Sequence, residues 1–216
     1  MKPATFLDAT IKGDTINLST DCRYMKTGYY VSLHAEVLGN QVIPSCENII
    51  DSSRTPILLL RAKRAGIPTL PFTVTDSVKK IISELGFPVV VFAVNPFIYD
   101  GYKTAENKSA LYRALKSLGM NYKFDVCVMP LKGEMVSFKA FFGKSQHPDP
   151  ATQKIAAKVY EVFKIPVCTL HIQKTPREAF LCGLQSVSKE ELSQEDLVAI
   201  SKEVSLLSEQ GEPLSV

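Results

Sequence analysis

Apolar positions along the chain follow two kinds of spacing, one helical and one strand-like. Helical spacing that ends at a glycine recurs in four segments, which are 28–38, 57–65, 76–85 (with Asp76 as its N-cap) and 104–118. Two further helices are predicted near the C-terminus, one beginning at Asp149 or Thr152 and one carrying apolar residues from Leu197 to Leu207. Pro88–Val94 is β-branched and does not alternate, which predicts a strand buried on both faces.

Shorter apolar segments predict the remaining strands. Residues 41–44 form one of them, and segments 124–130 and 134–142 flank Leu131-Lys132-Gly133, which predicts a hairpin. Two more strands, 166–173 and 179–185, lie around the turn 174–177. Because helices alternate with strands and some strands look like hairpins, we expect an α/β (or α+β) fold with a mixed sheet flanked by helices.

Composition and charge narrow the class of protein. The 216 residues are 45% apolar and 22% charged, which fits one large domain or two lobes and excludes intrinsic disorder. The net charge is only +3, so no nucleic-acid partner is expected. The five cysteines are irregularly spaced, the N-terminus lacks an apolar signal region, and Pro88–Val94 is too short to span a bilayer. We therefore expect a reduced, cytoplasmic protein without a membrane partner.

Motifs for common chemistries are missing from the sequence. It contains neither a glycine-rich phosphate loop nor a G-x-S-x-G elbow. Cys168, His171 and Cys182 lack the second close pair of ligands that is typical of a zinc site, so no metal site is predicted. Two binding candidates remain. One is a basic–aromatic patch around Tyr29 and Tyr30, and the other is the loop that leaves the most apolar strand and contains Asp100 and Tyr102.

Several segments resemble a known family. Tyr29–Ser45, Phe142–Pro150 and Ser188–Ser193 resemble the module found ahead of RimK-like ATP-grasp ligases. The middle of the chain resembles an ATP-grasp pattern in four segments, which are Arg61–Pro71, Glu84–Val91, Asp125–Gly143 and Ala179–Gln185. The resemblance implies an N-terminal α/β lobe over 1–52, an ATP-grasp-like α+β lobe over 53–190, and a C-terminal helix and tail over 191–216.

Departures from the ATP-grasp pattern fall on the residues that would carry its chemistry. The pattern has a phosphate-binding lysine where this sequence has Phe92, and Glu-x-Asn where it has Cys182-Gly-Leu184. Arg54 replaces an upstream lysine. Mg²⁺ needs hard oxygen ligands and phosphoryl transfer needs positioned cations, which a phenylalanine and a thiol do not supply. The resemblance therefore implies a degenerate active site, with no cofactor and no catalysis by the chain alone.

The resulting hypothesis is a non-catalytic accessory or recognition module of a RimK-like ATP-dependent peptide or amino-acid (carboxylate–amine) ligase. Its partner would be the ligase domain or the peptide substrate that the ligase modifies. The binding candidates are Arg54, Lys63, Arg64, Tyr29, Tyr30, Asp100 and Tyr102.

Two alternatives remain open. One is an active ATP-grasp-type ligase or nucleotide-binding enzyme with an atypical residue set, using ATP and Mg²⁺. Its cations would be Arg54, Lys63, Arg64 and Lys103, and its metal ligands would come from Asp100, Glu134 or Asp125. The other alternative is a plain interaction domain unrelated to ligases.

Overall fold

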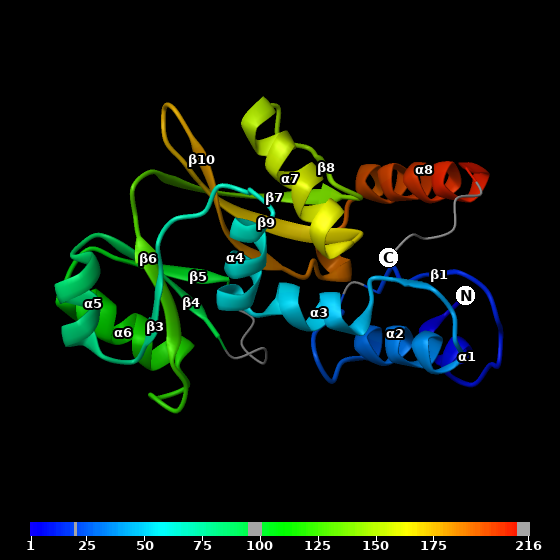
Figure 1. The fold of residues 1–216 in the computed structure, drawn as a ribbon, viewed down its shortest axis with the longest axis horizontal. Coiled ribbons are helices and arrows are strands. Elements are labelled where there is room, and N and C mark those ends of the chain that lie inside the picture. Colours follow the sequence, from blue (N-terminus) through cyan, green and yellow to red (C-terminus); the bar gives the residue numbers. More distant parts are fainter. Residues whose placement is uncertain (20, 95–100, 211–216) are drawn as a thin grey trace. The chain divides into compact units, whose positions relative to one another are not determined.

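The computed structural model describes residues 1–19, 21–94 and 101–210 of the chain (Figure 1). The chain divides into two compact units. Unit 1 comprises Met1–Ser52, Phe138–Thr169 and Ser186–Val216, and unit 2 comprises Ser53–Ser137 and Leu170–Gln185. Each unit is therefore built from segments that are far apart in the sequence. The three-segment organisation expected from the sequence stays a prediction.

Unit 1 is rich in helices. Its helices are α1 (Pro3–Leu7), α2 (Thr27–Val37), α3 (Cys46–Ser53, ending at the boundary), α7 (Pro150–Phe163) and α8 (Gln194–Gln210), with a short 3₁₀ turn at Lys189–Glu191. Strands β1 (Thr15–Ile16) and β2 (Val42–Ile43) pair in parallel, which confirms the strand expected at 41–44. Asn17 fixes this region, because its side-chain amide donates to the Gly28 carbonyl at 2.7 Å and to Ser32 Oγ at 2.9 Å.

Side-chain caps determine where the C-terminal helices begin. Asp149 caps α7 by accepting from the Thr152 backbone N–H at 3.0 Å. Ser193 and Asp196 form a reciprocal capping box before α8, since the backbone N–H of each donates to the side chain of the other. Asp149, one of the two residues at which the sequence predicts the first of these helices to begin, is therefore its N-cap.

A four-stranded sheet has the order β10-β9-β7-β8. Its strands are β7 (Glu134–Phe141), β8 (Lys144–Ser145), β9 (Val167–Lys174) and β10 (Ala179–Gln185). The unit boundaries fall inside β7 and β9. The two strands expected around the turn at 174–177 are neighbours in the sheet, so this prediction is confirmed.

Unit 2 holds a second, fully antiparallel sheet in the order β3-β6-β4-β5. Its strands are β3 (Thr73–Thr75), β4 (Val89–Ala93), β5 (Tyr102–Ala105) and β6 (Val126–Pro130). Helices α5 (Val78–Leu85) and α6 (Lys108–Leu118) pack on one face (Figure 1). Helix α4 (Thr55–Arg64) contacts β10. Residues 89–92 of β4 are fully buried, as the uniform apolar run predicts.

Three local predictions were wrong. The hairpin expected around Leu131-Lys132-Gly133 does not form, because β6 pairs with β3 and β4 while β7 joins the other sheet. The segment 104–118 is not one helix: 102–105 form strand β5, and α6 begins only after Asn107, whose side chain accepts from the Ala110 N–H at 2.9 Å. Ser77, and not Asp76, caps α5 by accepting from the Lys80 N–H. None of the helices in the described part of the chain is long and apolar enough to cross a membrane.

Candidate functional site

The two faces of β4 meet different apolar clusters in unit 2. Val89 and Val91 pack with α5 and α6. Val90 and Phe92 point the other way, into a cluster with Leu59, Leu70, Cys127, Met129 and Cys182. Phe92 is 2% exposed and Cys182 is fully buried. Phe92 and Cys182, at which the sequence resemblance implies departures from the ATP-grasp pattern, therefore share one filled apolar core.

The Phe92 ring lies directly on strand β10. A Cβ atom added to Gly183 would stand 2.7 Å from Phe92 Cε1, closer than side-chain atoms normally approach. The ring also contacts Tyr102, with centroids 5.5 Å apart, and His171, at 6.0 Å. Gly183 thus provides the space that the phenyl ring fills.

A buried histidine borders this aromatic group and connects two polar side chains. His171 is 5% exposed, its Nδ1 lies 2.8 Å from Ser137 Oγ, and its Nε2 lies 3.1 Å from Gln185 Oε1. Because the amide oxygen only accepts, the assigned Gln185 orientation places the ring proton on Nε2, and the Ser137 hydroxyl donates to Nδ1. Burial lowers the pKa of His171, and the bond to Gln185 opposes this shift only in part.

The thiols near Phe92 are not ionised. Burial raises the pKa of Cys127 and of Cys182 to about 12, and Cys182 Sγ donates to the Phe180 carbonyl. Thiols in this state are poor metal ligands, because the thiolate is the ligand form. Within residues 1–19, 21–94 and 101–210, no three His, Cys, Asp or Glu side chains are grouped so that they could hold a metal ion.

The α4 candidates lie at opposite ends of the helix. Arg54 precedes the first turn, whereas Lys63 and Arg64 are exposed in the last turn. A helix of 10 residues is about 15 Å long, so these cations are not brought together. Tyr102 does lie beside the aromatic group, with its ring 5.2 Å from that of His171. Asp100 lies outside the described residues.

The other candidates are distributed over both units. Tyr29 and Tyr30 belong to α2 of unit 1, and their rings form a row with Tyr24, with centroid distances of 5.2 and 5.8 Å. Tyr30 is 42% exposed. In unit 2, Lys103 lies on β5. Asp125 directly precedes β6, Glu134 is the first residue of β7, and both are exposed.

No pattern in the sequence predicts the Ser137–His171–Gln185 cluster. Ser137 precedes His171 by 34 positions and Gln185 follows it by 14. No short motif connects them. Only the pairing of β7, β9 and β10, which sequence patterns do not fix, brings the three side chains together.

Solved structures with a similar fold are ATP-grasp proteins. D-alanine–D-alanine ligase from Bacillus anthracis matches with a TM-score of 0.61 and 16% identity, over 83% of this chain and 74% of that one. An ATP-grasp RimK domain protein from Sphaerobacter thermophilus gives 0.59 and 16%, over 82% and 72%. D-alanine–D-alanine ligase from Coxiella burnetii gives 0.57 and 11%, over 79% of this chain but only 59% of its own length. These likenesses confirm the expected α/β, ATP-grasp-like fold.

The sequence itself has no match among curated proteins. A family model described as the RimK-like ATPgrasp N-terminal domain matches residues 5–202, which is nearly the whole chain and includes the segments that carry the resemblance. The chain therefore belongs to the RimK-like ATP-grasp N-terminal domain family.

Proposed function

We propose that this domain is a non-catalytic accessory or recognition module of a RimK-like ATP-dependent carboxylate–amine ligase. The observation that carries the proposal is the shared burial of Phe92 and Cys182 in one filled apolar cluster. These are the positions at which the ATP-grasp pattern has a phosphate-binding lysine and a metal-binding strand. Five free cysteines support a reducing, cytoplasmic setting.

The chemistry of this cluster argues against a nucleotide at the same place. A triphosphate and its Mg²⁺ need cations and hard oxygen ligands, and burying their charges among apolar side chains carries a large desolvation cost. Phe92 offers no polar atom. Its ring fills the space above Gly183, and Cys182 presents a neutral thiol. The residues present therefore do not fit a magnesium nucleotide.

The active-ligase alternative needs its cations to converge. Arg54 is separated from Lys63 and Arg64 by the length of α4, and this arrangement does not favour the alternative. Losing one positioned electrostatic partner typically lowers a catalytic rate by about 10²–10³-fold. The absence of both lysine and carboxylates from the two pattern positions supports a role in recognition over a role in turnover.

Nucleotide titration tests the first half of the proposal. We expect isothermal titration of the isolated chain with ATP and Mg²⁺ to show no metal-dependent binding up to about 1 mM ATP. A dissociation constant of about 1 mM corresponds to a binding free energy of about −4 kcal/mol. An active RimK-like ligase titrated in the same buffer is the positive control. Micromolar, Mg²⁺-dependent binding, or ATP hydrolysis by the chain, would contradict the proposal.

Association with a ligase tests the second half. The chain has no Trp, so tryptophan emission in a mixture reports on the ligase alone. We expect this emission to change on addition of the domain, sedimentation to show a complex, and the ligase rate to change. If neither a complex nor an effect on the ligase rate is found, the proposal is wrong.

A pair of variants locates the contact. Tyr30 is an exposed aromatic residue of the tyrosine row in unit 1, and aromatic residues of this kind commonly anchor interfaces. Tyr30→Ser is expected to weaken the complex by about fivefold or more. Leu60→Ser removes an apolar side chain that is 54% exposed in unit 2, and it should leave the affinity unchanged. Equal affinities for both variants would exclude the tyrosine row as the contact.

A further inference from the structure

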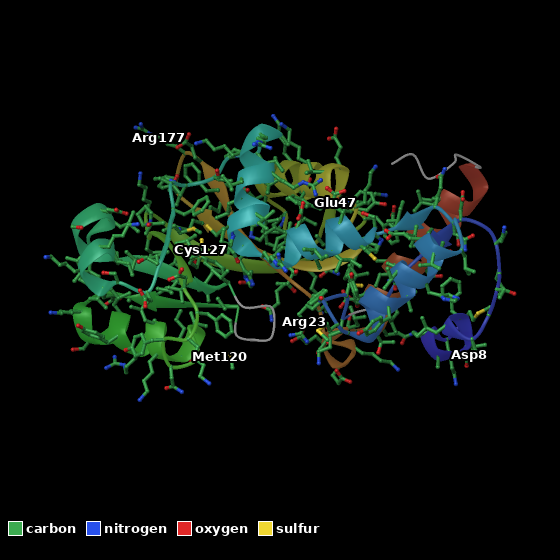
Figure 2. The ribbon with its side chains drawn as sticks, turned by 60° about the horizontal axis from the view of Figure 1, so that its bottom comes forward. Asp8, Arg23, Glu47, Met120, Cys127 and Arg177 are labelled. Atoms are coloured by element: carbon green, nitrogen blue, oxygen red, sulfur yellow. The ribbon has the colours of Figure 1, made fainter. Side chains whose placement is uncertain are left out.

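The outer face of α6 carries a stripe of polar and basic residues. Leu111, Ala114, Leu115 and Leu118 face the core of unit 2. On the other side, Arg113, Lys116 and Ser117 are exposed at helical intervals, and the exposed Met120 follows two residues after the helix ends. Met120 lies at the end of α6 on the surface of unit 2 (Figure 2). The stripe is therefore presented to solvent along its whole length.

The chain after α6 folds back tightly and brings a third cation to this stripe. The Gly119 carbonyl accepts the N–H groups of Lys123 at 2.8 Å and of Phe124 at 3.0 Å. A Cβ at Gly119 would stand 2.7 Å from the carbonyl oxygens of Leu115 and Phe124, so the turn requires glycine. The fold-back fixes Lys123 at the carboxyl end of the helix.

The same turn contains three consecutive left-handed residues. Met120, Asn121 and Tyr122 have φ values of 51°, 58° and 61°. Each such non-glycine residue costs roughly 1–2 kcal/mol. Strain of this size persists only where surrounding contacts hold it, and it is concentrated at functional surfaces.

Stripe and turn together line an open groove of about 540 Å³, which we call the α6 groove. Its lining residues are Arg113, Lys116, Ser117, Met120, Asn121 and Lys123. Across the described part of the chain, none of its three cations takes part in an ion pair. The carboxyl end of α6 stabilises Lys116, but Arg113 and Lys116, three positions apart, repel each other. The groove is thus an uncompensated cationic surface.

Exposed aromatic side chains are next in sequence to residues that line the α6 groove. Tyr112, Tyr122 and Phe124 are 45%, 44% and 45% exposed, and Met120 in the groove is 41% exposed. The Tyr122 hydroxyl donates to the Tyr112 carbonyl at 3.3 Å, which holds the turn against the helix. Exposed aromatic, methionine and arginine side chains gathered in one place are typical of surfaces that bind another chain.

We propose that the α6 groove binds an acidic peptide segment that carries an aromatic or large apolar side chain. Its carboxylates would pair with Arg113, Lys116 and Lys123, and its apolar side chain would pack on Met120 and Phe124. Charge complementarity selects this occupant. The three cations lie around one compact groove, whereas a nucleic-acid strand needs cations along an extended track. The proposal does not depend on association with a ligase.

Fluorescence polarisation with the full chain tests this inference. The probe is a labelled, glutamate-rich peptide with one central phenylalanine, and its binding should weaken as salt is added. The double variant Arg113→Glu/Lys116→Glu should lower the affinity by about tenfold or more, because two attractions become two repulsions. Lys79→Glu, a charge reversal at an exposed lysine of α5 outside the groove, should change it by less than about twofold.

Two further comparisons complete the experiment. A peptide with glutamine in place of glutamate should lose binding, and one with serine in place of phenylalanine should bind more weakly. Arg113→Gln/Lys116→Gln replaces the double reversal if thermal melting shows that the reversal unfolds the chain, and it should still weaken binding several-fold. The inference is overturned if the acidic peptide does not bind, if the groove variants bind like Lys79→Glu, or if a labelled oligothymidylate binds more tightly than the peptide.

Discussion

The ring of Phe92 rests on the backbone of Gly183, so closely that no side chain would fit between β4 and β10 at this point. The resemblance to ATP-grasp domains implies one departure at Phe92 and another at Cys182 and Leu184, the residues on either side of Gly183. The two departures are therefore neighbours in space. The Phe92 ring occupies the space that a side chain at position 183 would need, and glycine leaves that space empty. The structure relates the two departures to a single packing contact.

This contact predicts a non-additive pair of substitutions. Gly183→Ala should destabilise the chain by about 1–3 kcal/mol, because the new methyl group overlaps the Phe92 ring. In a Phe92→Leu background the same change should cost about 1 kcal/mol less, since the smaller side chain leaves room. Urea unfolding of the four proteins gives the coupling energy. If the two substitutions change the free energy of unfolding in a strictly additive way, the Phe92 ring does not contact the side chain at position 183.

Acid should destabilise the chain through His171. In the folded state, burial lowers the pKa of His171 below the ordinary value of 6.5. Well above pH 6.5 the imidazole is therefore neutral in both the folded and the unfolded state, and its titration does not change the stability. As the pH falls below 6.5, the unfolded state takes up the proton first, and stability falls by up to about 1.4 kcal/mol per pH unit. Urea unfolding from pH 8 to pH 5 should show this loss in the wild type. A His171→Gln variant with the same acid dependence would contradict the prediction.

Asp196 gives a second pH effect at lower pH in unit 1. Burial alone would raise its pKa, but hydrogen bonds from Lys139 (2.7 Å), Ser193 and Gln146 outweigh burial and lower it to about 2. The carboxylate is therefore stabilising above pH 3.8, and its contribution of roughly 2 kcal/mol is lost as the pH falls from 3.8 towards 2.

Asp196→Asn should accordingly lower the free energy of unfolding at pH 7 by about 2 kcal/mol, because the Asp196 side chain is 3% exposed and Lys139 loses its charged partner, keeping only the Glu191 carbonyl. The control is Lys144→Gln. It breaks the Lys144–Glu203 pair, in which the lysine is 66% exposed, and should cost less than about 1 kcal/mol. Both free energies of unfolding are measured by urea unfolding. If the two variants lose the same free energy, the buried Asp196 carboxylate does not stabilise unit 1 more than an exposed ion pair does.

The thiols should be unreactive in the native protein. Burial raises the pKa of all five cysteines to about 12, including Cys127 in the interior of unit 2 (Figure 2). At pH 8 the thiolate fraction of each is then on the order of 10⁻⁴. Ellman's reagent should modify the native chain far more slowly than free cysteine, and all five thiols should react in denaturant. Fast native labelling of any thiol would contradict this prediction.

Local sequence signals predicted the elements that depend on local chemistry. The uniform apolar run of β4 predicted a strand buried on both faces. The polar residues Asp149 and Thr152 predicted the start of α7, and Asp149 is its N-cap, because burial and capping act within a few residues. The resemblance to the RimK-like module rested on short segments of the same kind. The family match over residues 5–202 confirms it.

Features that depend on distant partners could not be predicted. Leu131-Lys132-Gly133 has the composition of a hairpin turn, yet the Leu131 N–H donates to the Pro88 carbonyl and the chain moves on to another sheet. Strand β5 is only four residues long and merges into the helical pattern that follows it. The partners of His171 come from other strands, and no spacing rule relates them. Register and sheet membership are decided by long-range packing, which a single sequence does not encode locally.

The segmented construction of the two units has a consequence for how the protein is made. Unit 2 is complete only when Leu170–Gln185 follows Ser53–Ser137, and unit 1 only when Ser186 and the residues after it follow Thr169. During synthesis on the ribosome, the apolar cluster under α5 and α6 can form from Ser53–Ser137 alone, but the cluster around Phe92 stays incomplete until Cys182 has emerged. Dissecting the protein by simple truncation would break both units, and separate production of either requires rejoining its pieces with engineered linkers.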